Sequence, residues 1–248
     1  MTALMERIYR KNPLTLALVW IGAYVVLMSL ADGLSDAVGV SKSVTVIVSA
    51  VLTVMLLGWV RTGKRAAYFG LAKPGAPAAG MLYYLPLAVM ISVNLWHGVA
   101  LNTSPVETVL YMVSMLFVGV LEEVIFRGLL FRAMAKDSMK AAVIVSSVTF
   151  GMGHIVNLLS GAPLLDSLLQ IVYATAVGFL FTVMFLRTGS IVPCIVCHSV
   201  LNALSAVANE GAATTADNIV SAAVLTVIPA AYALYIMKKT NSRTLPCE

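Results

Sequence analysis

The sequence predicts an all-α membrane protein, a polytopic bundle of about eight transmembrane helices. Of its 248 residues, 60% are hydrophobic and only 11% are charged, against about 25% charged residues in an average soluble domain. Apolar runs of about 20 residues, the length that crosses a bilayer, recur along the whole chain without the alternation of a membrane β-barrel. Helices are therefore the expected spanning elements, because a helix satisfies its own backbone hydrogen bonds in lipid.

Eight such runs set the boundaries of the predicted helices. The first begins at Asn12 and Pro13, a capping residue followed by proline at the first helical position, and the seventh begins in a similar way at Ser190 and Pro193. The fourth can continue as a helix through Met134. In chain order the predicted spans are residues 13–31, 43–60, 81–100, 108–126, 141–159, 167–186, 191–207 and 219–237.

The charges of the connecting segments predict the orientation. Lysine and arginine collect in the cytoplasmic loops of membrane proteins, and here basic connectors alternate with acidic ones, so that only Lys42 falls in the acidic set. Both termini are therefore predicted to be cytoplasmic. The basic connectors carry Arg7, Arg10, Lys11, Arg61, Lys64, Arg65, Lys73, Arg127, Arg132, Lys136, Lys140, Arg187, Lys238, Lys239 and Arg243.

The chain shows no internal division. It has no linker, repeat or low-complexity segment, so one membrane-embedded domain over residues 1–248 is expected. Its three cysteines are too few for a disulfide framework. The net charge of +5 is explained by membrane topology, and no nucleic-acid partner is predicted.

Two carboxylates lie near the end of the predicted fourth span, and an arginine directly follows it in the same apolar helical run. A charged side chain near the bilayer centre costs at least about 2.5–3.5 kcal/mol on insertion scales, so such residues usually mark a functional site. Glu123 and Arg127 are four residues apart, with the acid first, which favours an ion pair along a helix. Glu122 points elsewhere and has no partner in its own helix, which suits a general base. The alternative is that these charges mark the cytoplasmic flank of the span.

Two later spans each carry a pair of residues at helical spacing. Phe150 and His154 share one helical face, and His198 and Asn202 share another. An imidazole and an amide can donate hydrogen bonds to a developing oxyanion, and the imidazole can also bind a metal. Asn157 lies near the face of His154. The alternative for each histidine is a structural hydrogen bond.

Taken in order, these three motifs resemble the CPBP intramembrane protease family, which contains the CAAX prenyl endopeptidases and the bacterial Abi proteins linked to bacteriocin immunity. The motifs are Glu-Glu-x-x-x-Arg at 122–127, Phe-x-x-x-His at 150–154 and His-x-x-x-Asn at 198–202. Each is weak alone, but three in this order within membrane spans are specific. The motif-bearing core covers about residues 105–205, and the first hundred residues carry no diagnostic motif.

The resemblance implies an intramembrane endopeptidase that hydrolyses a peptide bond in a membrane-associated protein or peptide. It implies that Glu122 and His154 activate a water, and that His198 and Asn202 stabilise the tetrahedral oxyanion. The other residues of the motifs are expected to support the site: Glu123, Arg127 and Phe150.

The involvement of a metal is left open by these residues. Glu122, His154 and His198 are a possible zinc-binding set with water at the open position, as in a metalloprotease. A glutamate and a histidine acting without metal fit the same residues. We counted the residues from the cytoplasmic end of each predicted span to its motif. From these depths, the site should open toward the cytoplasmic half of the bilayer.

Two other classes of function would use the same residues. One is a non-proteolytic bacteriocin-immunity or regulatory protein that binds a peptide on the same fold. The other is a proton-coupled transporter with the carboxylates and histidines as a relay, which is disfavoured because no repeated half-helix pattern is present. In each case the expected location is the cell membrane of a bacterium, as a multi-pass protein.

Overall fold

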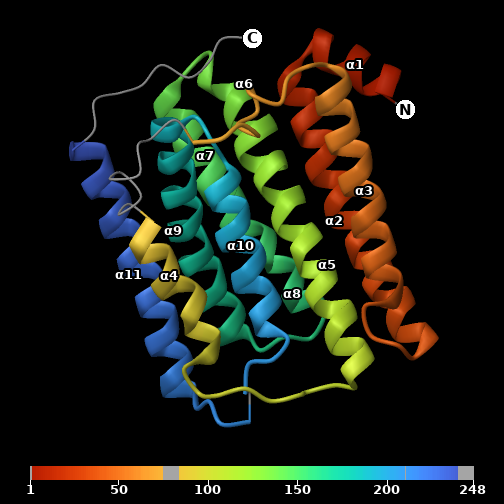
Figure 1. The fold of residues 1–248 in the computed structure, drawn as a ribbon, viewed down its shortest axis with the longest axis vertical. Coiled ribbons are helices and arrows are strands. Elements are labelled where there is room, and N and C mark those ends of the chain that lie inside the picture. The colour runs from red at the N-terminus through yellow and green to blue at the C-terminus, as the bar shows by residue number, and fades with distance from the viewer. Residues whose placement is uncertain (1, 75–83, 210, 240–248) are drawn as a thin grey trace.

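All regular elements described in the structure are helical, apart from one isolated antiparallel bridge between Val99 and Ala208. The computed structural model describes residues 2–74, 84–209 and 211–239. The long helices stand side by side (Figure 1). The elements are α1 (Thr2–Lys11), α2 (Pro13–Val38), α3 (Ser43–Thr62), α4 (Leu85–Ser92), η2 (Val93–Leu95), α5 (Pro105–Glu123), η3 (Val124–Phe131), α6 (Arg132–Ala135), α7 (Met139–Met152), η4 (Gly153–Ile155), α8 (Val156–Leu159), α9 (Leu164–Thr188), α10 (Val192–Ser205) and α11 (Thr215–Lys239).

The prediction of a polytopic helical membrane protein is confirmed. Six helical stretches among the described residues are long and apolar enough to cross a bilayer: Pro13–Val38, Ser43–Thr62, Pro105–Ala135, Met139–Leu159, Leu164–Thr188 and Thr215–Lys239. The third of these includes the predicted continuation through Met134. The other two predicted spans, 81–100 and 191–207, contain the shorter apolar helices Leu85–Leu95 and Val192–Ser205, and residues 81–83 lie outside the described part of the chain. The number of long spans is thus six where eight were predicted.

Capping residues explain where two helices begin. The side chain of Asn12 accepts hydrogen bonds from the backbone N–H groups of Leu14 and Thr15, so α2 begins at Pro13 as predicted. Ser104 and Glu107 form a reciprocal capping box at the start of α5, three residues before the predicted boundary.

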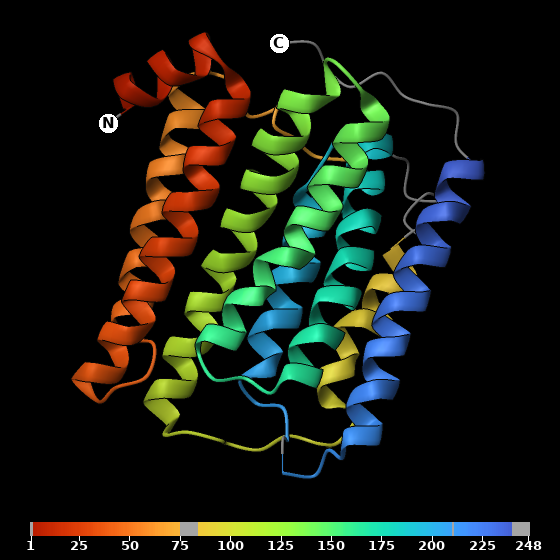
Figure 2. The same cartoon turned by 180° about the vertical axis from the view of Figure 1, so that it is seen from behind.

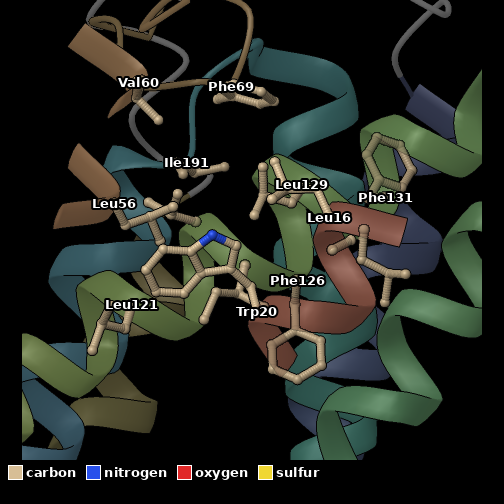
Figure 3. Packing of buried hydrophobic residues seen from close by; sticks show 14 of the residues in the cluster. Leu16, Trp20, Leu56, Val60, Phe69, Leu121, Phe126, Leu129, Phe131 and Ile191 are labelled. Carbon is tan, nitrogen blue, oxygen red and sulfur yellow. The ribbon is translucent and has the colours of Figure 1, made fainter. Parts of the chain in front are cut away.

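Apolar side chains cover the outside of the bundle as well as its interior. Val54 and Val227 are 70% and 63% exposed, which is the pattern expected of a surface that faces lipid. Inside, Leu16 and Trp20 of α2 pack with Leu56 of α3 and Leu121 of α5, and the same cluster continues through the residues labelled in Figure 3. This cluster fixes the helix that carries both glutamates of the first motif.

The two ends of the bundle differ in charge. Figures 1 and 2 show α1 and α6 at one end, and the α2–α3 and α8–α9 connections at the other. We call the first the basic end. Its described lysines and arginines are Arg7, Arg10, Lys11, Arg61, Lys64, Arg65, Lys73, Arg132, Lys136, Lys140, Arg187, Lys238 and Lys239. At the other end the described residues include Lys42 and five acids, which are Asp32, Asp36, Glu107, Asp166 and Asp217.

An ion pair holds α1 against the rest of the basic end. The guanidinium of Arg65 donates from both Nη atoms to the Glu6 carboxylate, at 2.9 and 3.0 Å, and Arg10 donates from Nε at 2.7 Å. These hydrogen bonds, from Arg65 above all and then from Arg10, lower the pKa of Glu6 from 4.5 to about 2. Met5 and Tyr9 bury the apolar face of the same helix.

We predict that the docking of α1 weakens in acid and that Glu6→Gln removes this dependence. Because the pKa of Glu6 is lower in the folded protein, its stabilisation is present above about pH 4.5 and is lost as the pH falls toward about 2. The pair is partly exposed, so we expect an effect of about 1 kcal/mol. Amide-exchange protection factors of residues 2–11 at pH 6 and pH 3 measure it. An equal loss of protection in the variant would contradict the assignment.

Candidate active site

A cavity of about 370 Å³ lies inside the bundle. Four of the residues that line it are the ones expected from the sequence to carry the chemistry: Glu122, His154, His198 and Asn202. They come from three different helical segments: Glu122 from α5, His154 from η4, and His198 and Asn202 from successive turns of α10. The fold thus brings the predicted residues to one hollow space.

The ion pair predicted between Glu123 and Arg127 is present. Nη1 of Arg127 donates to Oε1 of Glu123 at 3.0 Å, and both side chains are 0% exposed. The guanidinium also lies over the ring of Phe150, 4.1 Å from its centroid, a cation–π contact. Both charged side chains are enclosed by protein within the apolar helical stretch Pro105–Ala135, so they are not an exposed flank of the span.

The helix changes its hydrogen-bond register directly after Glu123. Residues Val124–Phe131 form a π-helix whose residues are all buried. Such segments are rare and are often found at functional sites. The hydroxyl of Ser146 in α7 donates to the backbone carbonyl of Phe126, at 2.9 Å, and so provides a partner for a carbonyl inside this segment. Arg127 therefore projects from a locally widened helix that a neighbouring helix supports.

His198 stands between the two glutamates. Its Nδ1 lies 2.9 Å from Oε1 of Glu123, and its Nε2 lies 3.7 Å from Oε2 of Glu122. A carboxylate paired with an arginine accepts hydrogen bonds, so Nδ1 carries the proton in this contact. The other ring nitrogen, Nε2, is left to face Glu122. The ion pair thus sets the orientation of the imidazole, much as a carboxylate orients a catalytic histidine.

Glu122 has a hydrogen-bond partner that the sequence did not suggest. The hydroxyl of Tyr24, in the middle of α2, donates to Oε1 of Glu122 at 2.6 Å. Tyr24 lines the same cavity. One hydroxyl in an apolar run is a weak signal, and the contact joins residues 98 positions apart in the chain. Glu122 is therefore held from another helix, while its own helix provides no partner, as expected.

Phe150 connects the two histidines. Its ring lies edge-on to His154, at 5.9 Å between centroids, and edge-on to His198, at 5.4 Å. Elsewhere in the cavity wall, the amide of Asn157 donates to Oε1 of Gln170 at 2.7 Å, and that of Asn94 donates to the carbonyl of Leu201. Phe150 thus packs against both imidazoles, which supports its predicted place beside the site.

The arrangement does not form a three-ligand metal site. Within residues 2–74, 84–209 and 211–239, no three His, Cys, Asp or Glu side chains are placed to hold a metal ion. Glu122 and His198, two of the three residues considered as zinc ligands together with His154, already contact Tyr24 and Glu123. We therefore derive no step through a metal.

The cavity extends away from the basic end. Its wall includes Asp32 of α2 and Lys42 of the α2–α3 connection, and Ser160 of the α8–α9 connection and Gln170 of α9. With the orientation that the charges predict, this is opposite to the expected opening toward the cytoplasmic half. That expectation rested on the depth of each motif along its own helix, whereas the space around the motifs depends on how neighbouring helices diverge.

Close packing of α5 against α10 holds Glu122 near His198. Gly119, one turn before Glu123 on α5, lies against Ser199, so that a Cβ at Gly119 would meet the Ser199 hydroxyl and lie 2.8 Å from its Cα. The neighbour of His198 therefore touches the backbone of α5, and only glycine permits this approach.

We predict that Gly119→Ala destabilises the protein by about 1–3 kcal/mol, the usual cost of overpacking, and lowers activity by moving His198 away from Glu122. The matched control is Gly58→Ala in α3, where a Cβ would meet nothing within 4 Å. Thermal unfolding of both variants in detergent measures the difference. Equal stability of the two would show that the α5–α10 contact tolerates a side chain.

The fold and the site define a class of protein: a polytopic helical membrane protein whose carboxylates and imidazoles meet in a cavity inside the bundle. Within that class, residues 104–204 match the family model described as Type II CAAX prenyl endopeptidase Rce1-like. The family resemblance predicted from the three motifs is thereby confirmed, and this family is one of CAAX endopeptidase-like hydrolases. No curated protein and no solved structure matched the chain in the other two comparisons.

Proposed function

We propose that this protein is an intramembrane endopeptidase that hydrolyses a peptide bond of a membrane-associated protein or peptide. The observation that carries the proposal is the position of Glu122 and His198 in one cavity, with Glu123 and Arg127 buried behind the imidazole. The match over residues 104–204 to a family of endopeptidases supports the same reaction.

In the proposed reaction, Glu122 is the general base. Its Oε1 accepts a hydrogen bond from Tyr24, which leaves Oε2 toward His198 and the cavity. A water beside this oxygen gives its proton to Glu122 and attacks the carbonyl carbon of the peptide bond. His154, which also lines the cavity, helps to hold that water.

The proton then has a path to the leaving group. Nε2 of His198 lies 3.7 Å from Oε2 of Glu122, and Nδ1 of the same ring is hydrogen-bonded to Glu123. A proton passed from Glu122 to Nε2 makes an imidazolium whose charge the Glu123 carboxylate balances. That N–H, together with the amide of Asn202, stabilises the oxyanion. Collapse breaks the C–N bond, the proton moves to the leaving nitrogen, and the products are a carboxylate and an amine.

The walls of the cavity suit an apolar peptide segment. α2 contributes the apolar side chains of Ile21, Val25 and Met28 beside the polar Tyr24, Ser29 and Asp32, and the α7–α8 side presents Thr149 and Asn157. An extended segment can place apolar side chains against α2 while its backbone faces polar groups. A membrane-anchored substrate would bring such a segment to the bilayer at high local concentration.

The experiment that tests the proposed function compares membrane-derived peptides from cells producing the wild-type protein with those from cells producing Glu122→Gln. We expect a set of cleavage products that the variant does not generate. Identical peptide sets, with the variant still protecting or regulating the cell, would favour the binding function in place of proteolysis. Both proteins must first be shown to reach the membrane in equal amounts.

Tyr24→Phe is predicted to reduce the turnover number by about 10-fold or more, because a hydrogen bond to a charged group contributes about 1.5–3 kcal/mol. The ring stays in place, so the Michaelis constant should change little. A shift of the pH–rate profile relative to the wild type would show that the lost hydroxyl acts on Glu122. An unchanged turnover number and profile would mean that Tyr24 only packs there.

A further inference from the structure

The cavity extends from the middle of the bundle toward the end opposite the basic end. α2 runs from the basic end at Pro13, and it contributes positions 21–32, from its middle toward its far end. α9 runs the other way, and it contributes 170–177, from the half far from the basic end. Helices of opposite direction thus place the cavity on the same side of the middle of the bundle.

The other half of the bundle is filled. On the basic side of Glu122 lie Leu129 and Phe131 of η3, which pack in one cluster with Phe69 and Ile191. All four are at most 2% exposed, and Figure 3 shows Phe69 and Ile191 beside Leu129. A peptide could not approach Glu122 from the basic end without displacing this cluster.

The distribution of charge indicates which side of the membrane the cavity faces. Apart from Lys42 and the buried Arg127, the lysines and arginines of the described residues belong to the basic end. Such an asymmetry places the basic end in the cytoplasm. The end of the cavity away from the basic end, where the lining residue Ser160 is exposed and which we call the mouth, then lies on the extracytoplasmic side.

We infer that the substrate enters this site from the extracytoplasmic face, past the α2–α3 and α8–α9 connections. That the entering molecule is a substrate rests on the proposed function. The route of access follows from the cavity and the charges alone. The substrate class is then a membrane-anchored peptide whose scissile bond lies in the outer half of the bilayer or just outside it.

The mouth carries an ion pair that such a peptide would meet first. Nζ of Lys42 lies 2.8 Å from Oδ1 of Asp32, and also 5.5 Å from the centroid of the Tyr111 ring. Asp32, Lys42 and Tyr111 all line the cavity. Both signs of charge are therefore available to the polar flank of an incoming segment, while Met28, Val25 and Ile21 of α2 provide apolar contacts further inward.

Thiol accessibility in intact spheroplasts tests the route. The parent protein is Cys247→Ser, in which the remaining cysteines, Cys194 and Cys197, are buried. Three cysteines, each introduced alone into this parent, are compared: Ser160→Cys at the mouth, Ser205→Cys in the cavity wall, and Lys140→Cys at the basic end as the matched control. A small, charged, membrane-impermeant methanethiosulfonate is applied before and after permeabilisation, and the fraction modified is read by mass spectrometry.

We expect modification at positions 160 and 205 in intact spheroplasts, and at position 140 only after permeabilisation. The reverse pattern would overturn the orientation. Modification at 160 without modification at 205 would overturn entry through this mouth. No step of the assay depends on catalysis, so a protein that cleaves nothing but shows the expected pattern would refute the proposed function and leave the access route standing.

Discussion

Replacement of Glu122 by glutamine is expected to lower the rate of peptide-bond cleavage by about 10²–10⁴-fold, the usual contribution of a general base. Glutamine keeps the length of the side chain and can still accept the hydrogen bond of Tyr24, at the position where Oε1 now lies 2.6 Å from the hydroxyl. It cannot take a proton from water. The loss should therefore appear in the turnover number, measured with purified protein in lipid vesicles.

The matched control for this variant is Glu107→Gln at the start of α5. That carboxylate belongs to a helix cap at the surface and does not line the cavity, so its loss should leave cleavage nearly unchanged. Thermal unfolding of all three proteins separates chemistry from stability. Full activity of Glu122→Gln with a normal unfolding temperature would end the proposal that this carboxylate is the base.

The sequence was sufficient to predict the local part of the site. The pairing of Glu123 with Arg127 follows from their spacing of four on one helix, which is independent of the rest of the fold. The position of His198 and Asn202 on one helical face follows from the same periodicity. The start of α2 follows from Asn12 and Pro13. Each of these depends on residues within one helical turn.

What could not be predicted depends on distant parts of the chain. The contact between Tyr24 and Glu122 joins two helices, and no spacing within either one indicates it. The π-helix after Glu123 lies buried inside the bundle, and no periodicity in the sequence indicates it. The short α10 ends at Ser205 although apolar residues follow, and hydropathy does not indicate where this helix stops. The direction in which the cavity extends depends on how the helices diverge, and the hydropathy of the sequence does not indicate this either.

Arg127→Met is expected to be the most destabilising of the single substitutions considered, at about 3–5 kcal/mol, the cost of leaving a buried charge without its partner. Both side chains of the Glu123–Arg127 pair are fully buried, so the carboxylate that remains has no water to replace the guanidinium. The packing of Phe150 beneath the guanidinium is lost as well. The free energy of unfolding in mixed detergent micelles measures the effect.

The double variant Glu123→Gln with Arg127→Met distinguishes the effect of an unpaired buried charge from the effect of lost side-chain packing. It leaves no unpaired charge, and the glutamine oxygen can still accept the hydrogen bond from Nδ1 of His198, so its stability should lie between those of Arg127→Met and the wild type. Its activity should nevertheless stay low, because a neutral amide does not balance an imidazolium at His198. A double variant as unstable as Arg127→Met would show that packing, and not the paired charge, holds this part of the bundle together.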